Sequence, residues 1–155
     1  MGVFSELFNE ELVFLDYSFR DQHDFFQKIS SMLYEKGYVK SSFYKAISQR
    51  EEKYPTGLRI EPFHVAIPHT DPSNIVRPFI AVVRPDHTIE FNEMGMANGK
   101  VEAQFLFVLG LNKGEGQAEL LSKLVNLFSN KEVMSRLMEE KEENQIIQLI
   151  KENID

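Results

Sequence analysis

The spacing of the apolar residues changes twice along this chain, and this limits the folds that it can adopt. Between positions 22 and 36 apolar side chains recur at helical spacing, and Gly37 follows where a helix C-cap belongs. From Gln117 onward the helical spacing returns and predicts a pair of helices near the C-terminus. The stretch between these helical regions follows a different pattern.

The middle of the chain consists of short runs rich in β-branched and aromatic residues, which are typical of strands. Strands are expected at Val65–Ile67, Phe79–Val83, Thr88–Phe91 and Val101–Leu109, with a further strand or extended arm at Leu12–Leu15. Ser41 or Ser42 is expected to cap a second helix, which ends before Pro55. This order predicts an α/β domain whose sheet is covered by helices from both ends of the sequence.

Length and charge exclude several classes of protein. The 155 residues, with a mass of 18.0 kDa, are expected to form one domain over 1–155. Seventeen Lys and Arg stand against 24 Asp and Glu, so the net charge is −7, and no basic run could neutralise a row of nucleic-acid phosphates. The apolar runs fall far below the roughly 18 residues of a membrane span, and the N-terminus has no signal-peptide pattern. We expect a cytoplasmic protein that neither binds nucleic acid nor inserts into a membrane.

Few residue types are available for catalysis. The chain has no cysteine, which removes disulfides, cysteine nucleophiles and thiolate zinc sites. Imidazole is therefore the main nucleophile left at neutral pH. The four histidines are His23, His64, His69 and His87.

His69 follows a predicted buried strand that ends at Pro68. Open α/β sheets bind ligands at strand ends, and the proline fixes the direction in which the chain leaves the sheet. A histidine aimed in this way is a candidate nucleophile. A histidine that only caps the strand, through hydrogen bonds to Thr70 or Asp71, fits the same residues.

A metal site that combines His69 with His64 is a third interpretation. The two histidines are five residues apart, so a continuous strand would place them on opposite faces. No helical histidine motif or acidic motif accompanies them. We therefore expect no metal.

Three motifs stand in order along the chain: Arg50-Glu51, Pro55-Thr56-Gly57-Leu58 and Val65-Ala66-Ile67-Pro68-His69-Thr70. Together they resemble the phosphohistidine signature of the enzyme IIA proteins of the bacterial sugar phosphotransferase system, in the fructose/mannitol superfamily. The resemblance covers almost the whole chain and implies the fold of that family, a mixed β-sheet covered by helices on both sides. It also implies that His69 takes a phosphoryl group from phospho-HPr and passes it to a IIB component, which serves a membrane IIC permease. No cofactor is expected.

Three residues are expected to support the phosphoryl group. In the resembled family the arginine that matches Arg50 lies beside the active histidine, although a solvated cation at a helix end fits Arg50 as well. Gln117 stands where fructose and mannitol members carry a second histidine, a replacement that resembles the galactitol-type branch and implies galactitol or a related polyol. Thr70 could donate its hydroxyl to the phosphoryl group or bond the turn, and for Thr56 we favour the turn.

The remaining expectations concern the surroundings of His69. His64 is expected to be structural or to contact a residue that itself touches the phosphoryl group. His23 and His87 are expected to lie at the surface. The face around His69 should be less acidic than the rest. Its apolar part could come from four residues for which core packing is the other interpretation: Phe63, Phe91, Met94 and Met96. A second function remains open, a regulatory module of the same fold whose phosphorylation controls a partner protein.

Overall fold

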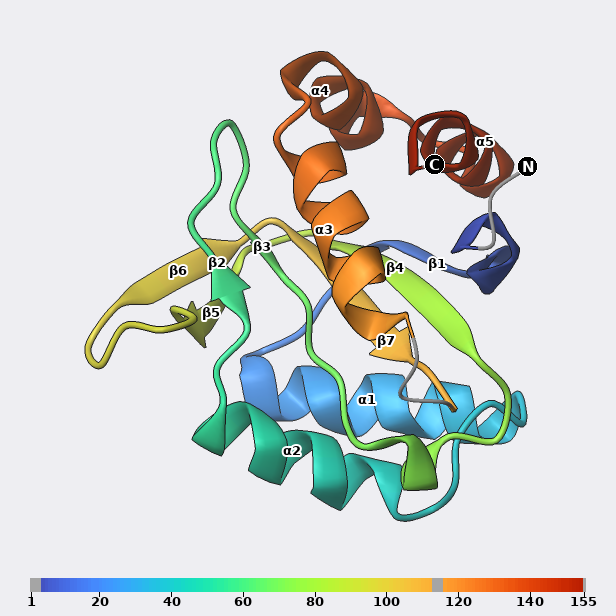
Figure 1. Ribbon diagram of the computed structural model, residues 1–155, viewed down its shortest axis with the longest axis vertical. Coiled ribbons are helices and arrows are strands. Elements are labelled where there is room, and N and C mark those ends of the chain that lie inside the picture. Colours follow the sequence, from blue (N-terminus) through green and yellow to red (C-terminus); the bar gives the residue numbers. More distant parts are fainter. Residues whose placement is uncertain (1–3, 113–115, 155) are drawn as a thin grey trace.

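A computed structural model describes residues 4–112 and 116–154. In chain order its elements are the 3₁₀ helix η1 (Phe4–Leu7), β1 (Phe8–Tyr17), α1 (Gln22–Glu35), α2 (Phe43–Lys53), β2 (Gly57–Leu58), β3 (Val65–Ala66), the 3₁₀ helix η2 (Pro72–Asn74), β4 (Phe79–Pro85), β5 (Ile89–Asn92), β6 (Lys100–Ala103), β7 (Phe105–Gly110), α3 (Gln117–Phe128), α4 (Lys131–Glu139) and α5 (Glu143–Ile154). Figure 1 shows these elements. Among the described residues, no helix combines the length and the apolar character of a membrane span.

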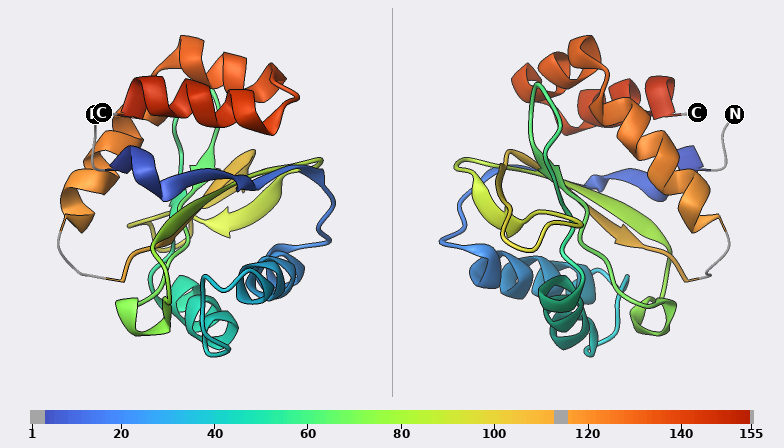
Figure 2. Two further views of the ribbon diagram at one scale, coloured as in Figure 1. Left: turned by 90° about the vertical axis from the view of Figure 1, so that its right-hand side faces the viewer. Right: turned by 60° about the vertical axis from the view of Figure 1, so that its left-hand side comes forward.

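Five strands form one mixed sheet in the order β1-β4-β7-β3-β2. β1 pairs with β4 and β3 with β7 in parallel, whereas β4 with β7 and β2 with β3 are antiparallel. β5 and β6 form a separate antiparallel ribbon. Figure 2 shows α1 and α2 on one face of the sheet and α3, α4 and α5 on the other. The expected mixed sheet with helices on both sides is confirmed.

The two central strands are buried on both faces, which explains why they read as unbroken apolar runs. In β4, Ile80 and Val82 pack with the helices of the C-terminal half. Ala81 and Val83 alternate with them and pack with α1 and α2. The sheet therefore separates two hydrophobic cores.

The helix over 22–36 is confirmed as α1. Its N-cap, Asp21, accepts a hydrogen bond from the Asp24 amide, and Gly37 follows its C-terminus with a φ of +83°, a left-handed conformation that favours glycine. The expected cap of α2 is wrong in its chemistry. Ser42 occupies the N-cap position, but its hydroxyl makes no capping bond and donates to Asn74 Oδ1 over 2.7 Å.

Two other expectations need correction. The predicted strand Val101–Leu109 is divided at Gln104, because the chain leaves the half-exposed β5–β6 ribbon there and enters the fully buried β7. The predicted C-terminal helix pair is three helices. Asn130 separates α3 from α4 and caps α4 by accepting from the Val133 amide, and an acidic junction then leads into α5.

Candidate functional site

His69 lies at the end of the path that β3 begins beside β7. Val65 pairs with Phe105, and four residues later His69 forms a bridge with Leu109, so the register is unbroken. The Leu109 amide donates to the Pro68 carbonyl over 3.0 Å. The central strand of the core thus fixes the backbone that carries His69.

A backbone carbonyl two residues earlier in the chain fixes the orientation of the His69 ring. Nδ1 of His69 lies 2.8 Å from the carbonyl oxygen of Ile67. A carbonyl oxygen only accepts, so Nδ1 carries the proton in this bond. In the neutral ring Nε2 then holds the free lone pair. The orientation is that of a nucleophile rather than of a ring bonded to the Thr70 or Asp71 side chain.

The surroundings of His69 favour the neutral ring. Burial lowers the pKa of His69, and the positive charge of Arg50 lowers it further. The hydrogen bond to the Ile67 carbonyl and the charge of Asp71 act against this, but the net direction of the pKa is downward. A neutral imidazole at neutral pH is the form that can attack phosphorus.

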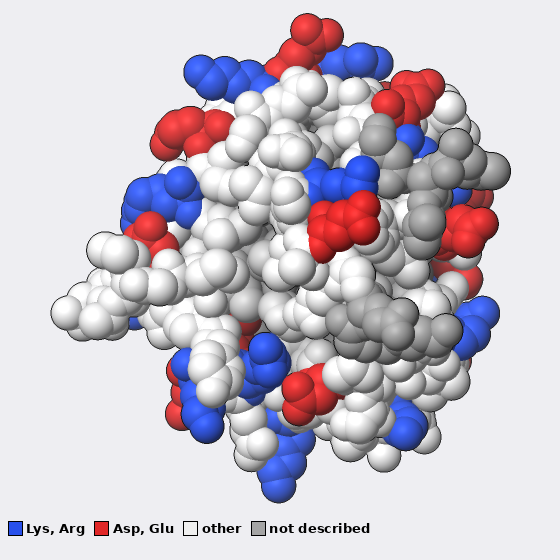
Figure 3. All heavy atoms as spheres, viewed as in Figure 1, with Lys and Arg blue, Asp and Glu red and all other residues white. Residues whose placement is uncertain are grey.

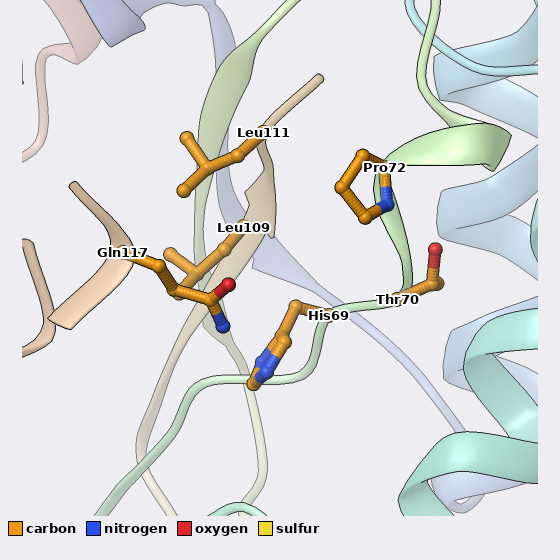
Figure 4. Close-up of a pocket in the computed structure, with 6 residues that line it drawn as sticks. All are labelled: His69, Thr70, Pro72, Leu109, Leu111 and Gln117. Atoms are coloured by element: carbon orange, nitrogen blue, oxygen red, sulfur yellow. The ribbon is translucent and has the colours of Figure 1, made fainter. Parts of the chain in front are cut away.

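A small pocket opens beside the ring. It is lined by His69, Thr70, Pro72, Leu109, Leu111 and Gln117. Figure 4 shows Gln117 pointing its side-chain amide toward the His69 ring from the opposite wall. The two leucines form an apolar wall, which limits water at the ring.

The N-terminus of α3 forms one side of this pocket. Gln117 is the first residue of α3, and the preceding Gly116 has a φ of +79° and provides no side-chain cap. The first amides of a helix have no partner within the helix, and the helix dipole favours negative charge at this end. Together with the Gln117 amide they make a suitable environment for an anion.

Arg50 approaches His69 from the last turn of α2. Its Nη1 lies 3.4 Å from Asp71 Oδ1, and its guanidinium lies 5.3 Å from the centre of the Tyr54 ring. Its Nε is buried and has no hydrogen-bond partner among the described residues. Since its charge lowers the pKa of His69, Arg50 lies within electrostatic reach of the ring. Its side chain is thus partly buried and paired with Asp71.

The Thr70 hydroxyl is engaged in the turn that follows His69. It donates to the Asp71 carbonyl over 2.8 Å and accepts from Asn74 Nδ2 over 3.0 Å. In Figure 4 it points away from the ring, although the residue lines the pocket. Of the two alternatives for Thr70, the geometry favours the turn.

His64 is not brought to this site. The unbroken register places it about 16 Å up the strand path from His69, at 3.3 Å per residue. His64 does not line the pocket beside His69, and Nδ1 of His64 is buried without a partner in the described part of the chain. Within residues 4–112 and 116–154 no group of three or more His, Asp or Glu could hold a metal.

Glu51 is a buried acid in the last turn of α2, for which the sequence predicted no role of its own. It accepts from the amide and the hydroxyl of Thr56, each over 2.7 Å, so the Thr56 hydroxyl bonds this carboxylate and not the turn backbone. Burial raises the pKa of Glu51 to about 7, against the effect of these two bonds. The burial of Glu51 is indicated in the sequence by its spacing of four residues from Ile47 and eight from Phe43, which places all three on one buried face of α2.

The surface over β2 and β3 carries few charged side chains. Figure 3 shows a largely white area there, with an adjoining basic and acidic side chain over α3 and further charged side chains toward the edges of the view. Phe91 belongs to the core and Phe63 is half-buried. Met94 and Met96, in the connection from β5 to β6, are exposed by 42% and 57%. Of the four apolar candidates, these two are exposed.

One protein-family model matches residues 6–153, and its description is phosphoenolpyruvate-dependent sugar phosphotransferase system, EIIA 2. The galactitol-specific EIIA component of Escherichia coli K12 is 25% identical over 121 residues, which cover 78% of this chain and 80% of that protein. The mannitol-specific enzyme IIA component of Staphylococcus aureus Mu50 is 26% identical over 152 residues, covering 96% and 97%.

Solved structures share the fold. The nitrogen regulatory protein IIA-Ntr of Neisseria meningitidis aligns with a TM-score of 0.78 at 22% identity and covers 96% of this chain and 99% of its own. The mannitol enzyme IIA of Escherichia coli, solved in a complex with phosphorylated enzyme IIB, aligns with a TM-score of 0.74 at 18% identity, covering 93% and 98%. The mannitol-type IIA fold expected from the sequence is confirmed.

Proposed function

Because the chain belongs to the EIIA 2 family of the phosphoenolpyruvate-dependent sugar phosphotransferase system, we propose that His69 is the residue that carries its phosphoryl group. Membership of this family makes the protein a phosphotransferase that acts as a phosphocarrier for sugar uptake. The observation that carries the assignment to His69 is the bond from its Nδ1 to the Ile67 carbonyl, which leaves Nε2 as the nucleophile.

The transfer exchanges one nitrogen–phosphorus bond for another. The lone pair of His69 Nε2 attacks the phosphorus of a phosphohistidine on the donor, the new N–P bond forms, and the donor's N–P bond breaks with its electron pair returning to the donor ring. The Nδ1 proton stays in its bond to Ile67, so the phosphorylated ring is an imidazolium, and the donor ring leaves as neutral imidazole because its other nitrogen carries a proton. Both ends of the reaction are phosphohistidines, so the exchange is reversible and requires no cofactor.

Three groups stabilise the negative charge that develops on the phosphoryl oxygens during transfer. The guanidinium of Arg50 offers a planar fork that suits a phosphoryl group, and Gln117 donates from its amide. The free amides at the N-terminus of α3 add a third source of attraction. Preorganised donors of this kind are the main source of catalysis in phosphoryl transfer.

The proposed donor is phospho-HPr and the proposed acceptor a IIB component, which in turn serves a membrane IIC permease. The mannitol enzyme IIA of the same fold forms a complex with phosphorylated enzyme IIB. The surface over β2 and β3, which carries few charged side chains, suits transient docking of such proteins.

The proposed sugar is galactitol or a related polyol. The galactitol-specific relatives are 25% identical and the mannitol-specific relatives 26% identical, so overall identity does not decide between them. Gln117, in the place of a second histidine, favours the galactitol type. Transfer of phosphate from the chain to purified IIB components for galactitol and for mannitol tests this choice, with the faster transfer expected to the galactitol IIB.

The assignment of His69 is tested with purified enzyme I, HPr and phosphoenolpyruvate. One phosphoryl group per chain is expected by mass spectrometry, and it should be lost in His69→Ala. His87→Ala is the matched control, because His87 is exposed and does not line the pocket. Full phosphorylation of His69→Ala would refute the assignment. Rapid uptake from HPr without transfer to any IIB would instead support the regulatory function.

A further inference from the structure

Asp71 is joined to Arg50 beside the His69 ring. The two side chains are 3.4 Å apart, between Oδ1 and Nη1. Asp71 precedes η2 but does not cap it with its side chain, so Arg50 is the partner that the structure gives this carboxylate. The Asp71 side chain is 74% exposed, and an ion pair as exposed as this is weak and opens at little cost.

The backbone around Asp71 is held in place without this ion pair. The Asp71 carbonyl accepts from the Asn74 amide over 3.2 Å and from the Thr70 hydroxyl over 2.8 Å. Asn74 also accepts from Ser42 over 2.7 Å, which ties the turn to the start of α2. The carboxylate of Asp71 can therefore leave Arg50 while the loop that carries His69 stays where it is.

Arg50 has hydrogen-bonding capacity that Asp71 does not use. A guanidinium has five N–H donors, and here one reaches Asp71 over a long distance while Nε is buried without a partner among the described residues. A phosphoryl group on His69 would bring several anionic oxygens within reach of the same guanidinium. Phosphate oxygens accept short, charge-assisted and often bidentate bonds from arginine, so they would compete successfully with an exposed carboxylate.

We propose, on the premise that His69 is the phosphorylated residue, that Asp71 is a positioning residue that holds Arg50 beside His69 before phosphorylation and yields it to the phosphoryl group afterwards. Because Asp71 competes for Arg50 and repels the phosphoryl oxygens, it lowers the fraction of the chain that is phosphorylated at equilibrium. Asp71 thus makes transfer to the next protein easier.

The test measures the equilibrium of phosphoryl exchange between HPr and the chain, with limiting phosphoenolpyruvate and catalytic enzyme I. Asp71→Asn removes the charge and keeps the shape of the side chain. It is expected to raise the equilibrium constant for uptake about two- to fivefold, the range that corresponds to an exposed ion pair. Asp71→Glu should restore the wild-type value. Asp86→Asn is the matched control, an exposed aspartate between β4 and β5.

A second readout does not depend on phosphorylation. An NMR titration of the His69 ring should give a lower pKa in Asp71→Asn than in the wild type, because a charge that raises this pKa has been removed. In an Arg50→Ala background, Asp71→Asn should lose most of its effect on the exchange equilibrium, since the competition runs through Arg50.

The outcomes separate this inference from the function on which it rests. If the wild type is phosphorylated normally and Asp71→Asn leaves the equilibrium constant unchanged or lowers it, the role of Asp71 is overturned while His69 stands. If the wild type accepts no phosphoryl group from phospho-HPr, the proposed function fails and this inference fails with it.

Discussion

The Nδ1 atom of His69 lies 2.8 Å from the carbonyl oxygen of Ile67, two residues earlier in the chain. Pro68 lies between them, and its carbonyl is in turn bonded to Leu109 of β7. The histidine ring is therefore oriented by a backbone that the central sheet holds. This relationship determines which ring nitrogen can act, and the predictions below depend on it.

The pKa of His69 is expected to lie below the ordinary histidine value of about 6.5. Burial is the main cause, so the neutral ring persists to lower pH than in an exposed histidine. An NMR titration of the ring in the unphosphorylated protein measures this directly, and the rate of phosphoryl uptake should stay high until the pH falls below that midpoint. A midpoint at or above 6.5 would contradict this account of the ring.

Arg50→Ala is expected to slow phosphoryl uptake by about a hundredfold, as the loss of a donor to transition-state charge does in other enzymes. Arg50→Lys should recover part of the rate, because it keeps the charge and loses the planar fork. Rapid-quench kinetics with phospho-HPr provide the measurement. Arg136→Ala, an exposed arginine on α4, is the control and should behave as the wild type. Equal rates in Arg50→Ala and the control would exclude Arg50 from the reaction.

Gln117→Ala is expected to lower the rate of uptake on the order of tenfold, because one donor to a charged group is removed. Gln117→His should restore much of the rate and should add a dependence on pH, since a histidine gains a charge where glutamine cannot. Comparing the pH profiles of the wild type and the two variants checks both points. Identical profiles in wild type and Gln117→His would show that residue 117 does not face the phosphoryl group.

Glu51 should make the protein less stable as the pH rises. Its pKa is about 7 in the folded protein against 4.5 in the reference state, so the folded protein binds the extra proton between these values. The contribution of Glu51 to the free energy of unfolding is complete below pH 4.5 and is lost as the pH rises through 7. Urea unfolding should show a loss on the order of 1 to 3 kcal/mol over this range.

Glu51→Gln resembles the protonated acid and should remove this contribution to the pH dependence. Glu52→Gln, the exposed neighbour on the same helix, should retain it. Equal slopes of unfolding free energy against pH in Glu51→Gln and the wild type would show that Glu51 does not titrate in this range.

The elements with strong local patterns were predictable from the sequence. The helix over 22–36 has a regular apolar face and a glycine at its end. The strand Phe79–Val83 is a short, unbroken run of apolar residues, which is typical of a strand buried on both faces of a sheet. β2 was missed because two residues carry no periodicity. Gly57 within it is instead required by close packing, since a Cβ there would lie 2.5 Å from Val101.

The candidate site was only partly predictable for a similar reason. His69 stood out through Pro68 and the apolar residues before it, which are neighbours in the sequence. The sequence did not show that Thr70 and Ser42 share Asn74 as a hydrogen-bond partner, because Ser42 and Asn74 are 32 residues apart. Polar contacts between distant segments follow from the fold, so the ion pair between Arg50 and Asp71 could be seen only in the structure.

The most direct test of the central claim is nitrogen and phosphorus NMR of the ¹⁵N-labelled protein after phosphorylation by phosphoenolpyruvate, enzyme I and HPr. The account predicts one phosphohistidine, at His69, with the phosphorus on Nε2 and the proton retained on Nδ1. Phosphorus on Nδ1 of His69, or on any other residue, would contradict it.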